Sequence, residues 1–310
     1  MFEKKYNQFL QRFEEMPYLK YLHAKDFPGL IAQSYSFNSG VNRINGYFYS
    51  YPGFKENILV IFCHGIGGGH SSYMREIEMI AKHGYKVLAY DCTGCVLSEG
   101  SSINAFGQSL VDLSNAIVSI KMNFHYEKIY VIGHSWGAYA TSNINNFQHV
   151  DKVVAVSPFI SLKREYKDLF KFMSLFITGP IMKIEKKKNG EYASSSAIDA
   201  LNKKDTNALV IASKDDNVIN FKHHTRVLMK KVNNPKVKFV IYEDKMHNPL
   251  YTKEGVRYYN DTFNKFNQLV KEKKIQTLQE KKDYFKDVDF FFTTNQDEKV
   301  WQEIFQFLDK

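Results

Sequence analysis

The pattern of hydrophobic and polar positions changes near residue 57. From there, short apolar runs alternate with longer amphipathic stretches as far as residue 247. Uninterrupted apolar runs are typical of strands buried on both faces of a parallel sheet. Their alternation with helix-like stretches predicts an α/β fold with a doubly wound, mostly parallel sheet. The six predicted strands lie within 58–64, 86–92, 128–135, 150–159, 208–216 and 237–247.

Two further elements are predicted upstream of this series. Residues 3–22 place Phe and Leu among charged residues at roughly helical spacing, and Pro28-Gly29 then breaks the pattern. We therefore expect an N-terminal helix. Residues 32–53 hold two alternating, Tyr- and Phe-rich stretches around Asn38-Ser39-Gly40, which predicts an antiparallel β-hairpin.

Two segments interrupt the alternation. Residues 160–207 contain the apolar run LFKFMSLFITGPIMKI and then a polar stretch, so they form either a functional lid or a long disordered loop. The apolar side chains favour a helical lid, because disordered segments are usually polar. Residues 250–293 carry a charged helical stretch. We therefore expect a core of residues 1–159 and 208–310, with an N-terminal extension (1–30), a C-terminal insertion (250–293) and a lid (160–207).

A terminal helix is predicted after the second insertion. Thr294 and Asp297 stand at the spacing of a capping box. The apolar residues that follow share one helical face, which we expect to pack on the sheet: Val300, Trp301, Ile304, Phe305 and Leu308.

Composition excludes several classes of protein. Of the 310 residues, 44% are hydrophobic and 15% aromatic, which is typical of a globular chain. The net charge of +9 is spread along the sequence, and no nucleic-acid-binding signature accompanies it. We expect a solvated, Lys-rich surface and no nucleic-acid partner. Weak attraction to membrane surfaces or anionic substrates stays open.

Several expectations concern compartment and cofactors. The N-terminal stretch lacks the apolar run of a secretory signal, and no segment has the length to span a bilayer, which makes a cytoplasmic location the default. Three cysteines suit a reducing compartment. Cys92 and Cys95 have the spacing of a redox dithiol or half a zinc site, but no second pair exists, so coincidence is favoured. No cofactor and no metal are expected.

The main chemical motif lies at the end of the third predicted strand. Gly133-His134-Ser135-Trp136-Gly137 is a G-x-S-x-G sequence between a strand and a predicted helix, the context of a nucleophile elbow. A serine nucleophile needs a base and a carboxylate that orients it, supplied in this fold in the order serine, acid, histidine. His247 follows a later strand. His134 itself is a candidate structural hydrogen-bonder.

The acid is one of two neighbouring residues. Asp215 and Asp216 both follow the strand ALVIASK, so both are expected at the same sheet edge as Ser135. The pattern from the residues alone leaves the choice between them open.

A glycine loop, HGIGGG at residues 64–69, follows the first predicted strand. Exposed backbone of this kind holds an anion, either a nucleotide phosphate or an oxyanion made during a reaction. The loop lacks the G-K-[ST] ending and the G-x-G-x-x-G spacing of nucleotide-binding motifs. The nucleotide interpretation therefore rests on the glycines alone.

From about residue 55 to 250, and in its terminal helix, the chain resembles the α/β-hydrolase superfamily. It is most similar to the serine hydrolases that include monoacylglycerol lipases, lysophospholipases and serine aminopeptidase-like (S33) enzymes. The resemblance implies that backbone N–H groups of Ile66 and Trp136 form an oxyanion hole, and that SKDDNVIN places the acid at Asp216. YDCTGCVLSEG matches a family segment but has Val96 where glycine is usual.

These features predict a serine hydrolase that cleaves a carboxylic ester through an acyl-enzyme on Ser135, with a lipid-like or small acyl ester as its partner. An aminopeptidase, amidase or thioesterase would use the same triad of Ser135, Asp216 and His247, and a non-catalytic binding protein is the alternative of another class. Apolar residues of the predicted lid either line an acyl pocket or pack on the core: Phe170, Phe172, Met173, Leu175 and Phe176.

Overall fold

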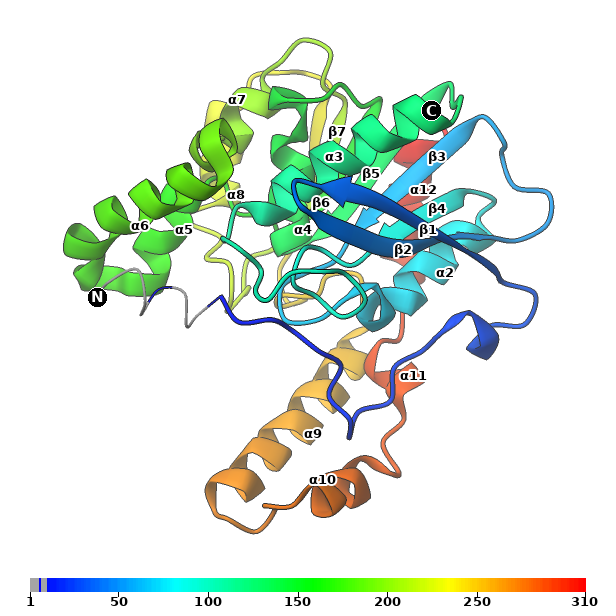
Figure 1. The fold of residues 1–310 in the computed structure, drawn as a ribbon, viewed down its shortest axis with the longest axis vertical. Helices are drawn as coiled ribbons and strands as arrows, with labels where there is room; N and C mark the ends of the chain where they lie inside the picture. Colours follow the sequence, from blue (N-terminus) through cyan, green and yellow to red (C-terminus); the bar gives the residue numbers. More distant parts are fainter. Residues whose placement is uncertain (1–5, 7–9) are drawn as a thin grey trace.

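The computed structural model describes residue 6 and residues 10–310. In this part of the chain, one eight-stranded sheet has the order β1-β2-β4-β3-β5-β6-β7-β8 (Figure 1). The strands from β3 to β8 run parallel, and β1 and β2 add an antiparallel edge. All six apolar runs form strands, so the predicted sheet is confirmed. The strands are β1 (Ile31–Ser39), β2 (Asn42–Ser50), β3 (Ile58–Cys63), β4 (Lys86–Tyr90), β5 (Lys128–His134), β6 (Lys152–Val156), β7 (Ala208–Ser213) and β8 (Val237–Tyr242).

The predicted N-terminal hairpin is confirmed as β1 and β2. Ser39 pairs with Asn42 across a two-residue turn, and Gly40 in that turn has a φ of 60°. Positive φ at the turn matches the twist of the two strands, which is why glycine suits this position. Strand β2 then pairs with β4 and joins the hairpin to the parallel sheet.

The sheet is covered on both faces because its buried strands alternate their side chains between two cores. In β3, Leu59 and Ile61 belong to one hydrophobic cluster, and Val60 and Phe62 belong to the other. The first face is covered by α3 (Gln108–Asn123), α4 (Trp136–Asn143), α7 (Ala197–Leu201) and α8 (Thr225–Lys231). The second is covered by α2 (Met74–Lys82) and α12 (Glu298–Leu308). The sheet is therefore doubly wound.

Residues 160–207 form helices and carry an exposed apolar tip. The segment contains α5 (Leu162–Phe170), η4 (Lys171–Met173), α6 (Ser174–Asn189), η5 (Gly190–Ser194) and α7, and α5 and α6 extend to one side of the body (Figure 1). Ile181 and Tyr166 pack into the first core. At the tip, Phe172, Leu175 and Phe176 are each more than 70% exposed.

The C-terminal insertion forms a helical hairpin with a small core of its own. It contains α9 (Lys253–Lys271), α10 (Leu278–Phe285) and α11 (Phe290–Thr293), and α9 and α10 project from the body (Figure 1). Phe266 of α9 packs against Phe285 of α10, and Tyr18 from the N-terminal segment stacks on Phe285. The predicted helical stretch is divided because Lys273 has a positive φ of 59° and Thr277 caps a new helix.

The prediction of an N-terminal helix over residues 3–22 is wrong for residues 10–22, whereas Tyr6 is helical. Residues 10–22 form an irregular, extended segment, and most of residues 3–9 lie outside the described part of the chain. The segment forms bridges to the loop after β4, Gln11 with Ser102 and Phe13 with Cys95. Its apolar residues do not share one face, because Leu10 packs into the first core and Tyr18 into the C-terminal hairpin.

Three further 3-10 helices and the cap of the terminal helix complete the backbone description. Three 3-10 helices lie at η1 (Ala24–Asp26), η2 (His70–Tyr73) and η3 (Ile144–Asn146). The terminal helix α12 is capped by Asp297, whose side chain accepts a hydrogen bond from the Lys299 N–H. The predicted capping box starting at Thr294 is therefore wrong, because the Thr294 hydroxyl instead donates to the carbonyl of Phe290, the first residue of α11.

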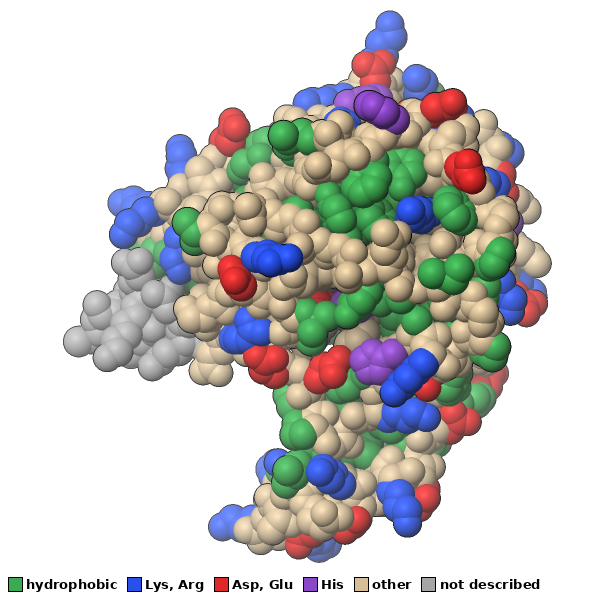
Figure 2. Space-filling model, turned by 45° about the vertical axis from the view of Figure 1, so that its right-hand side comes forward, with side chains coloured by type: hydrophobic (Ala, Val, Ile, Leu, Met, Phe, Trp, Pro, Cys, Tyr) green, Lys and Arg blue, Asp and Glu red, His purple; other side chains and the backbone are tan. Residues whose placement is uncertain are grey.

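The positively charged side chains are scattered over the surface. On the face shown in Figure 2, lysines and arginines are spread over the molecule and acidic side chains lie among them. Among the described residues, none of the helices has both the length and the apolar character to cross a bilayer.

Candidate active site

The nucleophile elbow is shaped by two close backbone contacts. Ser135 lies between β5 and α4 with a φ of 55°, a conformation that non-glycine residues rarely adopt. A Cβ atom on Gly133 would lie 2.5 Å from the carbonyl carbon of Gly137, and one on Gly137 would lie 2.1 Å from the carbonyl oxygen of Cys63. Only glycine fits both positions. The elbow therefore brings the start of α4 directly against the end of β3.

Ser135 and His247 meet across the edge of the sheet. The Ser135 Oγ lies 2.9 Å from Nε2 of His247, and the other ring nitrogen, Nδ1, lies 3.0 and 3.1 Å from the two carboxylate oxygens of Asp216. A carboxylate only accepts hydrogen bonds, so Nδ1 carries the proton and Nε2 is free to accept one from the serine. The three side chains predicted as nucleophile, base and acid are therefore joined by hydrogen bonds in that order.

The two neighbouring aspartates have different partners. Asp216 Oδ1 accepts hydrogen bonds from the backbone N–H groups of Val218 and Ile219, at 2.9 and 2.8 Å, and these bonds aim the carboxylate at the imidazole. Asp215 instead accepts from the Ser213 hydroxyl and from the Met246 N–H. Asp215 thus secures the loop before His247, while Asp216 contacts the ring itself.

The loop that carries His247 is also held by its backbone carbonyl. His134 Nε2 lies 2.8 Å from this carbonyl, and the Ser157 hydroxyl donates to the same oxygen at 3.1 Å. Because Nε2 of His134 must donate, its Nδ1 accepts from the Tyr73 hydroxyl, 3.0 Å away. Burial, together with the neighbouring His247 ring, lowers the pKa of His134 to about 3, so the ring stays neutral. Ser157 was missed in the sequence, where only its place after an apolar strand marked it.

The predicted oxyanion donors lie on two adjoining segments. Trp136 is the first residue of α4, where backbone N–H groups have no partner within the helix. Ile66 lies in the glycine loop after β3, and Gly67 in that loop has a φ of 96°. His64 shapes the start of the loop, because its Nδ1 lies 2.7 Å from the Gly65 carbonyl while its Nε2 accepts from the Cys92 N–H.

A cavity of about 560 Å³ opens beside the Ser135 and His247 side chains. Its walls come from the N-terminal segment, the glycine loop and the C-terminal insertion. Among the described residues, the lining includes Met16, Tyr18, Leu19, Lys20, Leu22, Ile66, Ser71, Tyr73, Arg75, Val218, Tyr251, Tyr259, Phe263, Phe266 and Phe290.

Of the two alternatives for the apolar residues of segment 160–207, lining of this cavity does not hold, because none of the described lining residues comes from that segment. Packing on the core holds for Phe170. Phe172, Leu175 and Phe176 do neither and are exposed at the tip of the segment. The cavity walls are built from segments 10–22 and 250–293, whose apolar residues are separated by charged ones.

Comparisons with known proteins give a family match over part of the chain and a shared fold. Residues 55–195 match the family model described as serine aminopeptidase, S33, a segment that contains the glycine loop and the elbow. No curated protein matches the chain in sequence. The fold is shared with an esterase of Pyrococcus furiosus, with a TM-score of 0.59 at 19% identity over 85% of this chain and 97% of that one.

The chain has the α/β-hydrolase fold. Two further solved structures share the fold. Est1E of Butyrivibrio proteoclasticus, solved with ferulic acid bound, has a TM-score of 0.56 at 15% identity and covers 69% of this chain and 90% of its own. Acylaminoacyl peptidase of Pyrococcus horikoshii has a TM-score of 0.52 at 16% identity, covering 72% of this chain and 38% of its own.

Within this fold, Val96 keeps the backbone shape that a glycine would adopt. Its φ is 36°, which is unfavourable for a β-branched side chain. The surrounding hydrogen bonds hold it there: the Val96 N–H donates to the Phe13 carbonyl, and the Arg12 guanidinium donates to the Val96 carbonyl. Val96 thus stands where the family pattern has glycine, and the loop still has a left-handed backbone conformation at this position.

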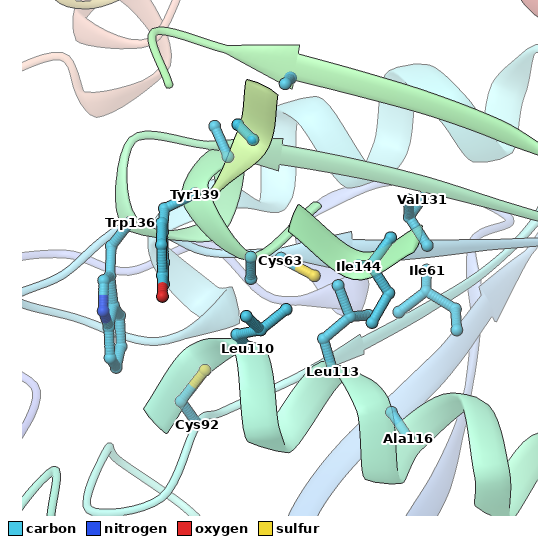
Figure 3. Packing of buried hydrophobic residues seen from close by; sticks show 14 of the residues in the cluster. Ile61, Cys63, Cys92, Leu110, Leu113, Ala116, Val131, Trp136, Tyr139 and Ile144 are labelled. Carbon is cyan, nitrogen blue, oxygen red and sulfur yellow. The ribbon is translucent and has the colours of Figure 1, made fainter. Parts of the chain in front are cut away.

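The thiols of this chain are all buried. Cys63, Cys92 and Cys95 are free thiols, and burial raises the pKa of each, that of Cys63 to about 12. Figure 3 shows Cys63 and Cys92 among core side chains that include Leu110 and Trp136. A buried thiol is a poor nucleophile and a poor redox centre, which supports coincidence as the origin of the Cys-x-x-Cys spacing. No group of three His, Cys, Asp or Glu residues within the described chain is arranged to hold a metal ion.

Proposed function

We propose that the protein is a serine hydrolase that cleaves a carboxylic ester through an acyl-enzyme on Ser135. The observation that carries this proposal is the hydrogen-bonded series of Ser135, His247 and Asp216, beside a cavity large enough for a small-molecule substrate. The chemistry of the series is acyl transfer to water, with the two stages described below.

In the first stage, Ser135 Oγ attacks the carbonyl carbon while its proton passes to His247 Nε2. The carbonyl oxygen becomes an oxyanion, which the N–H groups of Ile66 and Trp136 receive; each such donor is worth on the order of 10²–10³ in rate. The C–O bond to the alcohol then breaks, and His247 returns the proton to the leaving oxygen. Asp216 fixes the tautomer of the ring and stabilises its charged form.

In the second stage, water takes the place of the serine hydroxyl. His247 removes a proton from the water as its oxygen attacks the acyl carbon, and a second oxyanion forms in the same position. Collapse of this intermediate breaks the bond to Ser135, and the proton returns from His247 to Oγ. The carboxylic acid leaves and the free enzyme is regenerated.

An ester is favoured over the N-terminus of a peptide by the charge of the cavity. An aminopeptidase must hold the substrate's α-ammonium group, and a carboxylate is its natural partner. Among the described lining residues there is no Asp or Glu. Two solved structures with the same fold are an esterase and a ferulic acid complex, which is in keeping with ester cleavage. A thioester or N-acylated amide would use the same triad.

Labelling with a fluorophosphonate tests the nucleophile. We expect the intact protein to be labelled and the Ser135→Ala variant to be unlabelled, while Ser101→Ala, which removes an exposed serine from a loop, stays labelled. A folded protein that takes no label would be a binding protein on this fold.

Hydrolysis of p-nitrophenyl esters of graded chain length, measured beside aminoacyl anilides, tests the substrate class. Faster turnover of the anilides would overturn the ester assignment.

A further inference from the structure

The cavity beside Ser135 has an unbalanced charge. Its described lining contains two cations, Lys20 from the N-terminal segment and Arg75 from α2, and no carboxylate. Both cations lie over the ring of Phe291 in α11: the Arg75 guanidinium carbon is 5.2 Å from the ring centroid and the Lys20 Nζ is 6.0 Å from it. One region of an otherwise largely apolar cavity is therefore positive.

Arg75 also lacks the partners that a guanidinium usually has. Its Nε is buried, and within the described part of the chain it has no hydrogen-bond partner. No salt bridge joins Arg75 or Lys20 to a described acid. Leaving a charged donor unpaired costs free energy, so such a group indicates that something outside the protein completes it.

The acid next to Arg75, Glu76, lies within reach of the Arg75 charge, which opposes the rise of its pKa, but no salt bridge joins the two side chains. Glu76 accepts a hydrogen bond of 2.6 Å from the Tyr251 hydroxyl, and burial raises its pKa to about 7, so near neutral pH it is only a partial negative charge. Glu15 accepts from the Ser71 hydroxyl at 2.6 Å. Neither carboxylate lines the cavity. The positive charge of Arg75 thus remains available to a ligand.

We propose that the substrate is an ester that carries an anionic group, a carboxylate or a phosphate, and that Arg75 binds this group while Ser135 attacks the ester. The proposal rests on the esterase function proposed above. An arginine fork suits both anions because its N–H groups match their oxygens in pairs. Lys20 is exposed and adds a second, weaker attraction at the same end. Apolar and aromatic residues such as Leu22 and Phe263 then contact the chain between the two ends.

Matched substrate pairs test the proposal and locate the anion. One pair compares p-nitrophenyl hemi-esters of dicarboxylic acids with p-nitrophenyl esters of monocarboxylic acids of equal length, which places the charge on the acyl side. The other compares a monoacylglycerol phosphate with the monoacylglycerol, which places it on the leaving group. We expect the anionic member of at least one pair to have the higher kcat/KM, with a preference that shrinks as salt is added.

The variant Arg75→Gln should lower that preference by about 10- to 100-fold, the loss expected for a hydrogen bond to a charged group. Arg226→Gln, which removes an exposed arginine of α8 and the same net charge, should leave it unchanged. Equal kcat/KM values within both pairs, or a preference that survives in folded Arg75→Gln, would overturn the proposal. Esterase activity without any anionic preference would leave the function itself intact.

A binding measurement distinguishes a failure of the anion-site proposal from a failure of the proposed esterase function. Calorimetry of decanoate and of decane-1,2-diol with the Ser135→Ala protein needs no turnover. Tighter binding of decanoate at low salt that is lost in the Ser135→Ala/Arg75→Gln double variant supports an anion site at Arg75 even when none of the tested esters is cleaved. Equal or weaker binding of decanoate overturns the site, whatever the hydrolysis assays give.

Discussion

The ring of His134 donates a hydrogen bond of 2.8 Å to the backbone carbonyl of His247. The two residues are neighbours of the same nucleophile, one preceding Ser135 in the elbow and the other contacting its Oγ. The bond therefore ties the position of the proposed base to the position of the nucleophile. His134 is a positioning residue in this arrangement, because it touches neither Ser135 Oγ nor the reacting carbon in the proposed mechanism.

Replacing His134 should reduce turnover more than binding. In His134→Ala the His247 carbonyl keeps only the Ser157 hydroxyl, so the imidazole is held less closely to Ser135 Oγ. We expect kcat to fall by about 10- to 100-fold with KM changed less than threefold. Steady-state kinetics on a p-nitrophenyl ester give both values. The pH profile should keep its shape, because the pKa of His134 is already lowered to about 3.

The His134 prediction has an internal comparison. Ser157→Ala removes the other donor to the same carbonyl, and we expect a smaller fall in kcat because His134 keeps the loop in place. The double variant should fall further than either single one. A His134→Ala protein with a wild-type kcat and an unchanged melting temperature would show that the bond has no positioning role.

The neighbouring aspartates should respond differently to the same substitution. Asp216→Asn removes the carboxylate that contacts His247 Nδ1 and allows the wrong tautomer, so kcat should fall by about 10³- to 10⁴-fold. Asp215→Asn affects the loop before His247 and should cost far less in kcat than in stability. Single-turnover kinetics and thermal melts of both variants provide the comparison. A larger loss of kcat in Asp215→Asn would reverse the assignment of the acid.

Much of the sheet and the geometry around Ser135 could be predicted because short, local patterns encode them. Each strand from β3 to β7 contains a continuous apolar run, whereas the edge strand β8 includes Lys238, and the elbow requires glycines at fixed positions around Ser135. The predicted serine and histidine meet, and Asp216 joins them. Their catalytic roles remain predictions.

The walls of the cavity could not be predicted in the same way. They depend on where segments 10–22 and 250–293 pack. The apolar pattern of these two segments does not indicate which surface each one packs against. The sequence predicts Tyr18 to lie in an N-terminal helix. In the structure it stacks on Phe285, which is distant in sequence. The anionic preference inferred for the cavity follows only from lining residues that tertiary structure brings together, Lys20 and Arg75.

Val96 offers a test of backbone strain near the site. Its φ of 36° is costly for a β-branched residue, and glycine adopts such a value freely. Val96→Gly should therefore stabilise the protein by about 1 kcal/mol, after the loss of a partly buried side chain is subtracted. Val96→Ala loses most of the same side chain but keeps Cβ, and it should be no more stable than the wild type. Urea unfolding measures both. A Gly variant less stable than the Ala variant would contradict the strain.

Glu165 of α5 should make stability depend on pH. Burial, with Asp168 and Asp216 nearby, raises its pKa from 4.5 to about 8, and the neutral ring of His224 faces it at 3.3 Å. The unfolded chain loses this proton near pH 4.5, whereas the folded chain keeps it to about pH 8. The unfolded state therefore binds fewer protons in this window, and the free energy of unfolding falls as pH rises from about 4.5 to 8.

Glu165→Gln removes this ionisation and should separate the effect from other titrations. At pH 4 we expect the variant and the wild type to differ little. At pH 8 the variant should be more stable by on the order of 2–4 kcal/mol, because the wild type alone has lost the contribution of the protonated carboxyl. Glu56→Gln, at an exposed position, provides the control for net charge. Melting temperatures measured at each pH unit give the difference directly, and a difference between Glu165→Gln and wild type that is constant from pH 4 to 8 would place the Glu165 pKa near its ordinary value.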